Sequence, residues 1–507
     1  MRTMRFVMVA LEVLLSLCIN AKELYITVDD VDYKIDTHEK TATVTGRKHH
    51  QLSGYCELII PSTITYEGVL YKVTKIADAH ADGTGVFEEN PYYDDYSTNR
   101  RYLTSVIIGD NVEIIGDKAF YNCKYLEYLS IGSKVQEIKG GAFGGVSEYS
   151  GRLTVNINNL ATWCEAIFQY GITPLAKASY VTIKGKELKD LVIPNGVKQI
   201  RNAFEGCTFL TSITIPNSVT TIGSDAFRGC TGLTSIVIPN SVTYMYSGAF
   251  AGCTSVTSVT IGSGLHVLRS GVFSGCNITS VNIPDNVTDV SGFSGCKNLK
   301  YVIIGNGAQS ISTGAFSGCE SLTSVTIGSG MTQLGGTIFA GCENLKDVYC
   351  YAEKAPKTVV EPLNPGQNTF ADCYIEDATL HILASSQGYF EWGSGDWSEF
   401  GTVEFIGSRQ LTYVVDGEVY ETITIEDGRE IKPLEEPTKE GYTFSGWSEI
   451  PAIMPAKDVT VTGTFTLVDD ITDVDADVVP SIKKIIRNGE IIIIRNGQEY
   501  DVNGTLK

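Results

Sequence analysis

The sequence predicts a β-rich solenoid of coils of about 23 residues with short helical turns, followed by a small all-β domain. The first observation is a motif of the form Ala-Phe-x-Gly-Cys that recurs along the chain, most often at a spacing of 23 residues. A fixed period of this length is typical of solenoids, in which each repeat is one supersecondary unit stacked on its neighbours. The phenylalanines of the motif are Phe120, Phe143, Phe204, Phe227, Phe250, Phe273, Phe293, Phe316 and Phe339.

Two further observations support this prediction. Other residue types keep the same period, so they should form continuous buried columns when the coils stack. The period is then lost beyond about residue 406, where a different pattern of strands begins. One column contains Ile213, Ile236, Val259, Val281, Val302 and Val325, and another contains Cys207, Cys230, Cys253, Cys276, Cys296, Cys319 and Cys342.

A single coil, residues 210–230, shows the expected local structure. Ile213 and Ile215 alternate with polar residues, as a half-buried strand requires, and a Pro-Asn-Ser turn ends that strand. A second apolar edge follows at Ile222, and Phe227 lies in a short helical turn closed by glycine. One coil cannot bury its own apolar edge, whereas stacked coils can.

Two irregularities interrupt the period. The interval between Phe143 and Phe204 is long, and its segment 160–168 has apolar residues at helical spacing, so we expect one long repeat that carries a helix. The step between Phe273 and Phe293 is three residues short, which predicts a local dent in one loop.

The repeat LTSITIPNSVTTIGSDAFRGC resembles the BspA-like leucine-rich repeats of surface proteins from Bacteroidota and some other microbes. The resemblance extends over residues 103–406. Residues 55–76 are similar to the N-terminal lead-in of those proteins, and residues 378–406 are similar to their C-terminal cap. The resemblance implies a leucine-rich-repeat solenoid at the cell surface that attaches to host proteins or to other microbes.

A different β pattern follows the solenoid. Asp416-Gly417 lies between two alternating segments, which is typical of a hairpin turn. Residues 441–447, together with Met454-Pro455-Ala456, resemble the small β modules called Listeria–Bacteroides repeats, which serve as stalks or spacers. The tail at 481–507 reads as a β-hairpin and resembles C-terminal tails of secreted Bacteroidota proteins, some of which are sorting signals.

The N-terminus has the features of a secretory signal. Arg2 and Arg5 precede an apolar stretch at 6–17, and residues 19–21 form a plausible cleavage site. Lipidation at Cys18 is the alternative, which we consider weaker because a large leucine precedes it. No later run is apolar and long enough to span a membrane, so we expect export across the inner membrane to the outside or the cell surface.

The predicted domains follow from these boundaries. They are a signal peptide at 1–21, an N-terminal β cap with an insertion loop at 22–102, the solenoid with its C-terminal cap at 103–406, a small β domain at 407–467, an acidic linker at 468–480 and the hairpin-like tail at 481–507.

Composition and motifs exclude several classes of function. The net charge of −20 argues against nucleic acid and against anionic membranes as partners. The six histidines are scattered without zinc-site spacing, and no phosphate-binding loop or nucleophile elbow is present, so the sequence predicts no catalytic, cofactor or metal site and no enzyme activity. We expect the repeat cysteines to be buried, reduced packing residues, while Cys350 and Cys373 fall outside their column and are the candidate pair for a disulfide.

Two surfaces are candidates for binding. One is an aromatic loop that interrupts the first repeat and has the Tyr, Arg, Ser and Asn composition of binding loops; a loop that simply covers the N-terminal edge of the solenoid is the alternative. The other is the outward strand face, whose short hydroxyl side chains make weak anchors. The candidate loop residues are Tyr92, Tyr93, Tyr96, Arg100, Arg101 and Tyr102, and the outward residues of the strand face are Thr211, Ser212, Thr214, Thr234, Ser235, Val237, Thr257, Ser258, Thr260, Thr323, Ser324 and Thr326.

These features predict a secreted or surface-displayed, non-enzymatic binding protein or adhesin. The expected partner is a host matrix protein or a microbial surface protein, with a glycan as an alternative ligand. Two other functions fit the same sequence. One is a structural spacer that displays a neighbouring module, and the other is a carbohydrate-binding accessory protein.

Overall fold

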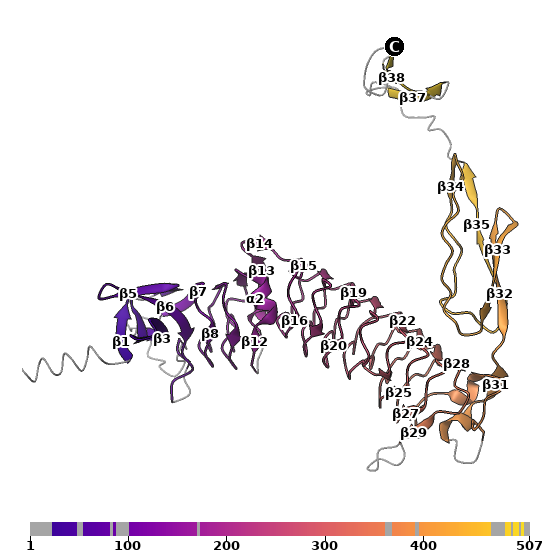
Figure 1. Cartoon of the computed structure of the whole chain (residues 1–507), viewed down its shortest axis with the longest axis horizontal. Helices are drawn as coiled ribbons and strands as arrows, with labels where there is room; N and C mark the ends of the chain where they lie inside the picture. The colour runs from indigo at the N-terminus through magenta and orange to yellow at the C-terminus, as the bar shows by residue number, and fades with distance from the viewer. Residues whose placement is uncertain are drawn as a thin grey trace, which may run out of the picture. The chain divides into compact units, whose positions relative to one another are not determined.

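The computed structural model describes residues 23–47, 54–81, 85–87, 101–169, 173–359, 368–390, 395–467, 482–487, 490–495 and 498–500 (Figure 1). The predicted signal peptide and acidic linker lie outside these residues. The chain divides into two compact units, and the predicted domain limits remain predictions. The first unit comprises Met1–Arg409, Thr424–Ile431 and Pro451–Lys457, and the second comprises Gln410–Ile423, Lys432–Ile450 and Asp458–Lys507.

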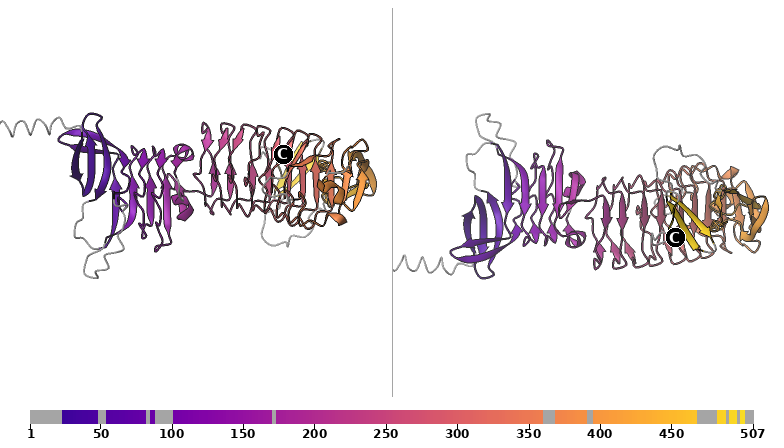
Figure 2. Two further views of the ribbon diagram at one scale, coloured as in Figure 1. Left: turned by 90° about the horizontal axis from the view of Figure 1, so that it is seen from below. Right: turned by 90° about the horizontal axis from the view of Figure 1, so that it is seen from above.

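The first unit is the predicted solenoid, and the predicted fold class is confirmed. Most coils contribute one longer strand and one short strand to two different sheets, in which strands of successive coils pair in parallel (Figure 2). Paired strands come from successive coils. In the last sheet, for example, four valines from four coils lie in register, namely Val281, Val302, Val325 and Val348. The apolar columns therefore follow directly from the period of the sequence.

The longer strands form four sheets, of six, two, two and six strands. The first sheet ends at the antiparallel hairpin of β13 and β14, then β15 pairs with β17 and β19 with β21, and the last sheet begins at β22. The strands are β4 (Gly54–Ile60), β7 (Arg101–Ile108), β9 (Tyr128–Ile131), β11 (Leu153–Ile157), β13 (Ala178–Ile183) and β14 (Lys186–Glu187); β15 (Asp190–Val192), β17 (Ser212–Thr214), β19 (Ser235–Val237) and β21 (Ser258–Thr260); and β22 (Ser280–Ile283), β24 (Tyr301–Ile304), β26 (Ser324–Ile327), β28 (Asp347–Cys350), β30 (Thr379–Ile382) and β31 (Thr402–Phe405).

The short strands form the second side of the stack, at the predicted second apolar edge. Ile222 pairs in register with Ile200 and Met245, and all three side chains are buried. The strands are β8 (Ile114–Ile115), β10 (Glu137–Ile138), β12 (Ile167–Phe168), β16 (Gln199–Ile200), β18 (Thr221–Ile222), β20 (Tyr244–Met245), β23 (Asp289–Val290), β25 (Ser310–Ile311), β27 (Gln333–Gly335) and β29 (Lys357–Val359).

An antiparallel sheet closes the N-terminal end of the stack. Val31, Tyr33 and Ile35 alternate inward along one strand and are buried, as a sheet with one covered face requires. This sheet continues in parallel into the short strands, so the first coil is not left with an open edge. Its strands are β1 (Glu23–Val28), β2 (Val31–Asp36), β3 (Thr41–Arg47), β5 (Thr63–Tyr66) and β6 (Val69–Ile76).

The phenylalanine column forms the centre of the core. Neighbouring rings from Phe204 to Phe339 lie nearly parallel, with centroids 5.1–5.8 Å apart. The column is longer than the sequence motif indicates, because Phe87 stacks on Phe120 and Phe370 stacks on Phe339. Trp397 then packs edge-on against Phe370, so the parallel stacking of rings ends there.

The cysteine column lies beside the phenylalanines. From Cys230 to Cys342, each thiol donates to the carbonyl of the phenylalanine one coil earlier, as Cys253 does to Phe227 O at 3.2 Å. Cys373 makes the same bond to Phe339 O at 2.9 Å, so it belongs to the column and the prediction that it lies outside is wrong. Cys350 instead accepts a hydrogen bond from Tyr389. All twelve cysteines that the structure describes are free thiols, Cys350 and Cys373 included.

The long repeat differs from its prediction in one respect. A helix, α2 (Leu160–Glu165), does form, with the Asn159 side chain accepting from its first backbone N–H groups. It ends at Glu165, and Ile167 and Phe168 form strand β12, which pairs with β10. Pairing with the preceding coil therefore overrides the helical spacing over these last residues. Trp163 donates to Ala203 O and is buried, so it is a packing residue.

Three 3₁₀ turns complete the solenoid, η1 (Pro174–Lys177), η2 (Ile375–Asp377) and η3 (Gly395–Glu399). The second unit is all β. Asp416 and Gly417 both have positive φ at the turn between β32 and β33, as a hairpin of the predicted kind requires. Its strands are β32 (Ser408–Val415), β33 (Glu418–Glu426), β34 (Tyr442–Phe444), β35 (Val459–Gly463) and β36 (Phe465–Leu467), followed by the antiparallel tail strands β37 (Ile482–Arg487), β38 (Glu490–Arg495) and β39 (Gln498–Tyr500).

Trp447 is the centre of the packing in this second unit. Its ring meets those of Tyr413 and Phe444 at centroid distances of 4.8 and 4.9 Å, and its Nε1 donates to Leu434 O. Within the part of the chain that the structure describes, no helix has both the length and the apolar character needed to cross a membrane.

Candidate binding site

The predicted aromatic loop falls mostly outside the described residues. This holds for Tyr92, Tyr93, Tyr96 and Arg100, and Arg101 is described only as the first residue of β7. Tyr102 is described, and its ring lies 4.1 Å from that of Tyr125 between centroids. Tyr125 in turn lies 5.3 Å from Tyr149, so Tyr102 is the first of three neighbouring tyrosines. A binding role for this loop remains a prediction.

The strand face is exposed over its central part, as predicted. Thr211, Ser212 and Thr214 are all exposed, and the first two donate to the Asp190 carboxylate. Later along the stack the prediction is wrong, because Ser324 is 4% exposed and Thr326 is fully buried.

A two-stranded ribbon covers the strand face at that point. We call residues 424–431 and 451–457 the cover ribbon; its two halves pair through Gly428 N to Met454 O and Met454 N to Arg429 O. Thr326 Oγ1 donates to Gly428 O at 2.5 Å, and Asn282 Nδ2 donates to Glu430 Oε2 at 2.6 Å. The ribbon is distant in sequence, and this is why the repeat pattern alone could not predict it.

Two tyrosines, Tyr349 in β28 and Tyr351 just after it, form the surface beneath the cover ribbon. The Arg429 guanidinium lies 3.9 Å from the centroid of the Tyr351 ring, and the Tyr351 hydroxyl donates to Asp427 O. Gly428 has φ +78°, and a Cβ there would lie 2.4 Å from Tyr349 Cγ, so only glycine fits against that ring. Asp427 is fully buried and accepts from Arg409 Nε at 3.0 Å, which compensates its charge.

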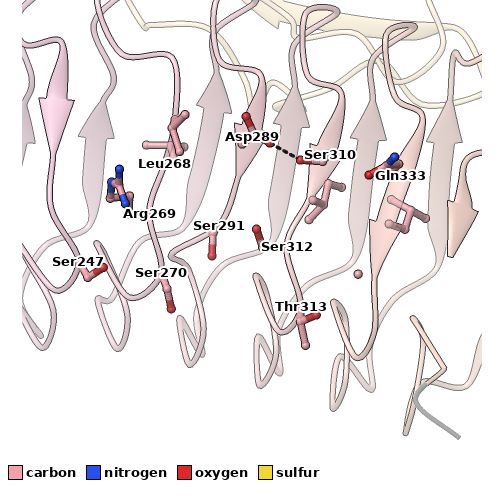
Figure 3. Close-up of a pocket in the computed structure, with 14 residues that line it drawn as sticks. Ser247, Leu268, Arg269, Ser270, Asp289, Ser291, Ser310, Ser312, Thr313 and Gln333 are labelled. Carbon is pink, nitrogen blue, oxygen red and sulfur yellow. Dashed lines mark hydrogen bonds between the residues drawn. The ribbon is translucent and has the colours of Figure 1, made fainter. Parts of the chain in front are cut away.

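An open hollow of about 590 Å³ lies on the other side of the stack, over the short strands (Figure 3). Two outward columns of residues run across it, and we call them the first and second outer columns. In the first outer column the partners in register are Gln199, Thr221 and Tyr244, and then Val267, Asp289, Ser310, Gln333 and Lys357. The second outer column lies two residues later and contains Arg201, Gly223, Tyr246, Arg269, Ser291, Ser312 and Gly335, of which Gly223 and Ser291 are buried.

The hollow forms where large residues give way to small ones along these columns. After Arg269 the second outer column continues with Ser291, Ser312 and Gly335, whose short side chains leave the space open. The coil that carries Ser291 is also shortened, because two of its three missing residues fall between Val290 and Phe293. This agrees with the dent predicted from the 20-residue step.

A tyrosine–arginine cluster stands next to the hollow. Tyr244 and Tyr246 are 40% and 41% exposed, and their rings meet at nearly right angles with centroids 4.8 Å apart. The Arg269 guanidinium lies 4.7 Å from the Tyr244 ring centroid and 6.0 Å from that of Tyr246, and it donates to the Tyr244 hydroxyl. Arg269 itself lines the hollow, so the cluster holds a cation at its edge.

A carboxylate lies on the floor of the hollow. Asp289 Oδ1 accepts from Ser310 Oγ at 2.5 Å, the bond drawn in Figure 3, and Asp289 Oδ2 accepts from Thr288 Oγ1 at 2.8 Å. Neither Asp289 nor Arg269 forms an ion pair with another residue that the structure describes. The hollow therefore offers hydroxyls, one carboxylate and, at its edge, one guanidinium for holding a polar ligand.

The sequence predictions did not include this site, although the sequence carries a signal for it. In register, Tyr244 stands where the preceding coil has Thr221 and Tyr246 where it has Gly223, so one coil places two aromatic rings in columns that have no other aromatic residue among those named. Such departures from the repeat on an exposed side mark positions that packing does not require. Among the described residues, no group of three His, Cys, Asp or Glu side chains could hold a metal ion.

Comparison with known families agrees with this architecture. The model of the BspA type leucine rich repeat region matches in six copies over residues 94–171, 179–292 and 289–387, which is more than half of the chain. The model of the Listeria-Bacteroides repeat domain matches residues 410–469. No protein with a curated description matches the chain.

Solved structures of bacterial leucine-rich repeat proteins are similar to the chain. A leucine rich cell surface protein from Faecalibacterium prausnitzii is 24% identical with a TM-score of 0.42, and the match covers 76% of this chain and 96% of that one. A leucine-rich repeat protein from Bacteroides ovatus is 20% identical with a TM-score of 0.40, covering 75% and 100%. The pneumococcal vaccine antigen PcpA is 16% identical with a TM-score of 0.36, covering 71% and 94%.

The extent of the family match, the period of the coils and the stacked phenylalanine column lead to one conclusion: the chain belongs to the family of proteins with a BspA-type leucine-rich repeat region.

Proposed function

We propose that this chain is an exported, non-enzymatic surface protein that attaches to a partner through the outer surface of its solenoid. The observation that carries the proposal is the tyrosine–arginine cluster beside the hollow. Tyr and Arg dominate binding energy at interfaces, and here Tyr244, Tyr246 and Arg269 lie together on the exposed side of the short strands.

Packing does not account for this cluster. The register partner of Tyr244 is Thr221, and the fold forms the same pair of short strands with either residue. The two rings are 40% and 41% exposed, and the neighbouring coil folds with Thr221 and Gly223 at the same positions, so the core does not require them and their presence favours a role at the surface. Export is supported by the signal-like segment at 1–21 and by membership of the family, and the aromatic loop at 91–102 remains a second proposed contact.

The experiment compares the full chain with three sets of variants, each of which changes one candidate binding surface. One set changes the tyrosine–arginine cluster, one changes the aromatic loop, and one places Lys on the central strand face. Binding is measured by solid-phase assay to mucosal extract and to intact microbial cells, and each variant must keep the melting temperature of the parent. Protease treatment of intact producing cells, followed by detection of the chain, tests surface display.

The proposal requires at least one set of variants to lose binding while the protein stays folded. Binding that survives all three sets and disappears only when residues 410–507 are removed would contradict it, because recognition would then lie outside the solenoid. A chain that is protected from protease in intact cells would contradict surface display.

A further inference from the structure

We propose that the hollow over the short strands is a binding site for a neutral oligosaccharide. The inference rests on the proposed function and adds the chemical class of the ligand. Its size fits this assignment, because the volume of about 590 Å³ lies within the range of ~300–1,000 Å³ usual for small-molecule sites.

The lining matches a ligand rich in hydroxyl groups. A hydroxyl side chain can donate and accept at once, and a side-chain amide offers both functions on separate atoms. A sugar presents the same alternation of donors and acceptors on neighbouring carbons. The hollow provides six hydroxyl side chains and one amide, from Ser247, Ser270, Ser291, Ser310, Ser312, Thr313 and Gln333.

The two charged groups fit paired hydroxyls better than a charged ligand. Asp289 keeps acceptor capacity beyond its bonds from Ser310 and Thr288, because an ionised carboxylate has about four lone-pair sites. Arg269 has five N–H donors in a fixed fork, and the Tyr244 ring and hydroxyl hold that fork in place. A carboxylate acceptor and a guanidinium donor can each bind two adjacent hydroxyls.

The electrostatics disfavour an acidic ligand. Asp289 lies in the same hollow as Arg269, so an anion attracted by the guanidinium would also meet a carboxylate. The chain as a whole carries a net charge of −20, which repels anions at longer range. A neutral sugar is repelled neither by the Asp289 carboxylate nor by the net charge of the chain.

The tyrosines supply the apolar part of the site. A pyranose has a face of C–H groups, and a tyrosine ring can cover that face. Tyr244 and Tyr246 stand at the edge of the hollow with about two fifths of each side chain accessible. Because their rings are nearly perpendicular, they offer two differently oriented surfaces to one ligand.

A peptide fits this site less well. An extended peptide gains most of its affinity by pairing with an exposed strand edge, but β25 is already paired with β23 on one side and β27 on the other. The hollow therefore presents side chains and no free edge at β25. A protein partner that binds here would depend on the same side chains without that backbone contribution.

The test uses the full chain on an array of immobilised neutral oligosaccharides of hexose and N-acetylhexosamine, with sialylated and sulfated oligosaccharides as a second arm. Three changes follow the repeat itself, so that each residue introduced is one that another coil carries at the same column position. They are Tyr244→Thr, Tyr246→Ser and Arg269→Ser. Ser312→Tyr fills the floor and leaves the cluster intact, and Tyr374→Ser, which removes a tyrosine that is 59% exposed elsewhere, is the control.

We expect the parent to bind neutral spots, and the triple variant and Ser312→Tyr to bind at least about tenfold more weakly, as the loss of a hot-spot contact produces. Tyr374→Ser should bind like the parent, and all melting temperatures should agree. Unchanged binding by Ser312→Tyr, binding confined to the sialylated and sulfated arm, or no binding to any spot would each overturn the assignment.

A second measurement separates this inference from the proposed function. The full chain is assayed on mucosal extract before and after enzymatic removal of glycans. Loss of binding supports the oligosaccharide. Binding that survives deglycosylation but is lost in the cluster variants overturns the sugar assignment and leaves attachment through the solenoid standing. Binding that no solenoid variant changes would overturn both the sugar assignment and attachment through the solenoid.

Discussion

The interior columns and the outer columns of the solenoid obey different rules. In the interior, phenylalanine stacks on phenylalanine from one coil to the next and every ring from Phe204 to Phe339 is fully buried. In the first outer column, threonine, tyrosine, valine, aspartate, serine and glutamine follow one another in register. The difference shows that stacking specifies one side chain inside and leaves the outside free to vary, which is where recognition can be encoded.

The largest expected effect comes from removing one ring of the interior phenylalanine column. Phe250→Ala removes a fully buried ring that stacks on both neighbours, and such cavities cost ~3–5 kcal/mol. We expect a clear fall in melting temperature measured by circular dichroism, spreading beyond one coil because neighbouring coils are coupled. The exposed change Tyr374→Ser should alter stability by less than ~0.5 kcal/mol. Equal melting temperatures for the two variants would show that the column is not the core.

A second test asks how firmly the cover ribbon closes the strand face. Gly428→Ala places a Cβ against the Tyr349 ring, whereas Gly417→Ala has the same positive φ but no atom within 4 Å, so it controls for backbone strain alone. We expect Gly428→Ala to cost ~1–3 kcal/mol beyond the control, as overpacking does. Hydrogen exchange should then show faster exchange of the Gly428 and Met454 amides, which bond across the ribbon. Unchanged protection would mean that the ribbon tolerates the displaced ring.

A third test uses alkaline pH to compare buried thiols with their unfolded state. Burial raises the pKa of the Cys296 thiol from 9.0 to about 12. Below pH 9 both states keep the proton, and between about pH 9 and 12 only the unfolded chain loses it, so stability falls as pH rises by ~1.4 kcal/mol per pH unit for this thiol.

Cys296→Ala removes that contribution. Its loss of stability between pH 8 and pH 10, measured by denaturant titration, should be smaller than the parent's by ~1.4 kcal/mol. The non-titrating change Ser317→Ala in a neighbouring turn should follow the parent. Identical alkaline losses in all three proteins would mean that the thiol is not buried in solution.

The smallest expected effect on stability comes from changes at the outer surface. Replacing Tyr92, Tyr93, Tyr96 and Arg100 by Ser should weaken partner binding without moving the melting temperature, because Tyr and Arg supply most interface energy. Placing Lys at Thr214, Thr234 and Thr257 should leave binding unchanged, since that face offers mainly short hydroxyl side chains. The reverse result would return recognition to the strand face.

The sequence predicts the interior well because a period in the sequence becomes a column in space. It missed the two ends of the phenylalanine column, since Phe87 and Phe370 are separated from their neighbours by segments longer than one period. It also predicted Ser324 and Thr326 as exposed, because the ribbon that covers Thr326 comes from about a hundred residues later in the chain. Contacts of that separation leave no periodic signal.

For the candidate site, the sequence reveals the residues but does not reveal the hollow beside them. Tyr244, Tyr246 and Arg269 are visible in the sequence as departures from the repeat, but the hollow depends on how several coils combine. Gly292 illustrates this, because at φ +99° it turns the shortened corner where a Cβ would lie 2.7 Å from Arg269 O. The consequence of a local deletion for the neighbouring coil becomes apparent only once the coils are stacked.

The equal spacing of the rings bears on how such a chain can change over time. Each coil meets the next through nearly the same contacts, so in-frame duplication or loss of one whole unit, such as residues 231–253, would rejoin Cys230 to a sequence that begins like its own continuation. Recombination between repeats could therefore alter the length of the protein without a folding penalty at the junction. Because that unit carries Tyr244 and Tyr246, its gain or loss would also add or remove two residues of the proposed site as a single inherited block, while Arg269 belongs to the next unit.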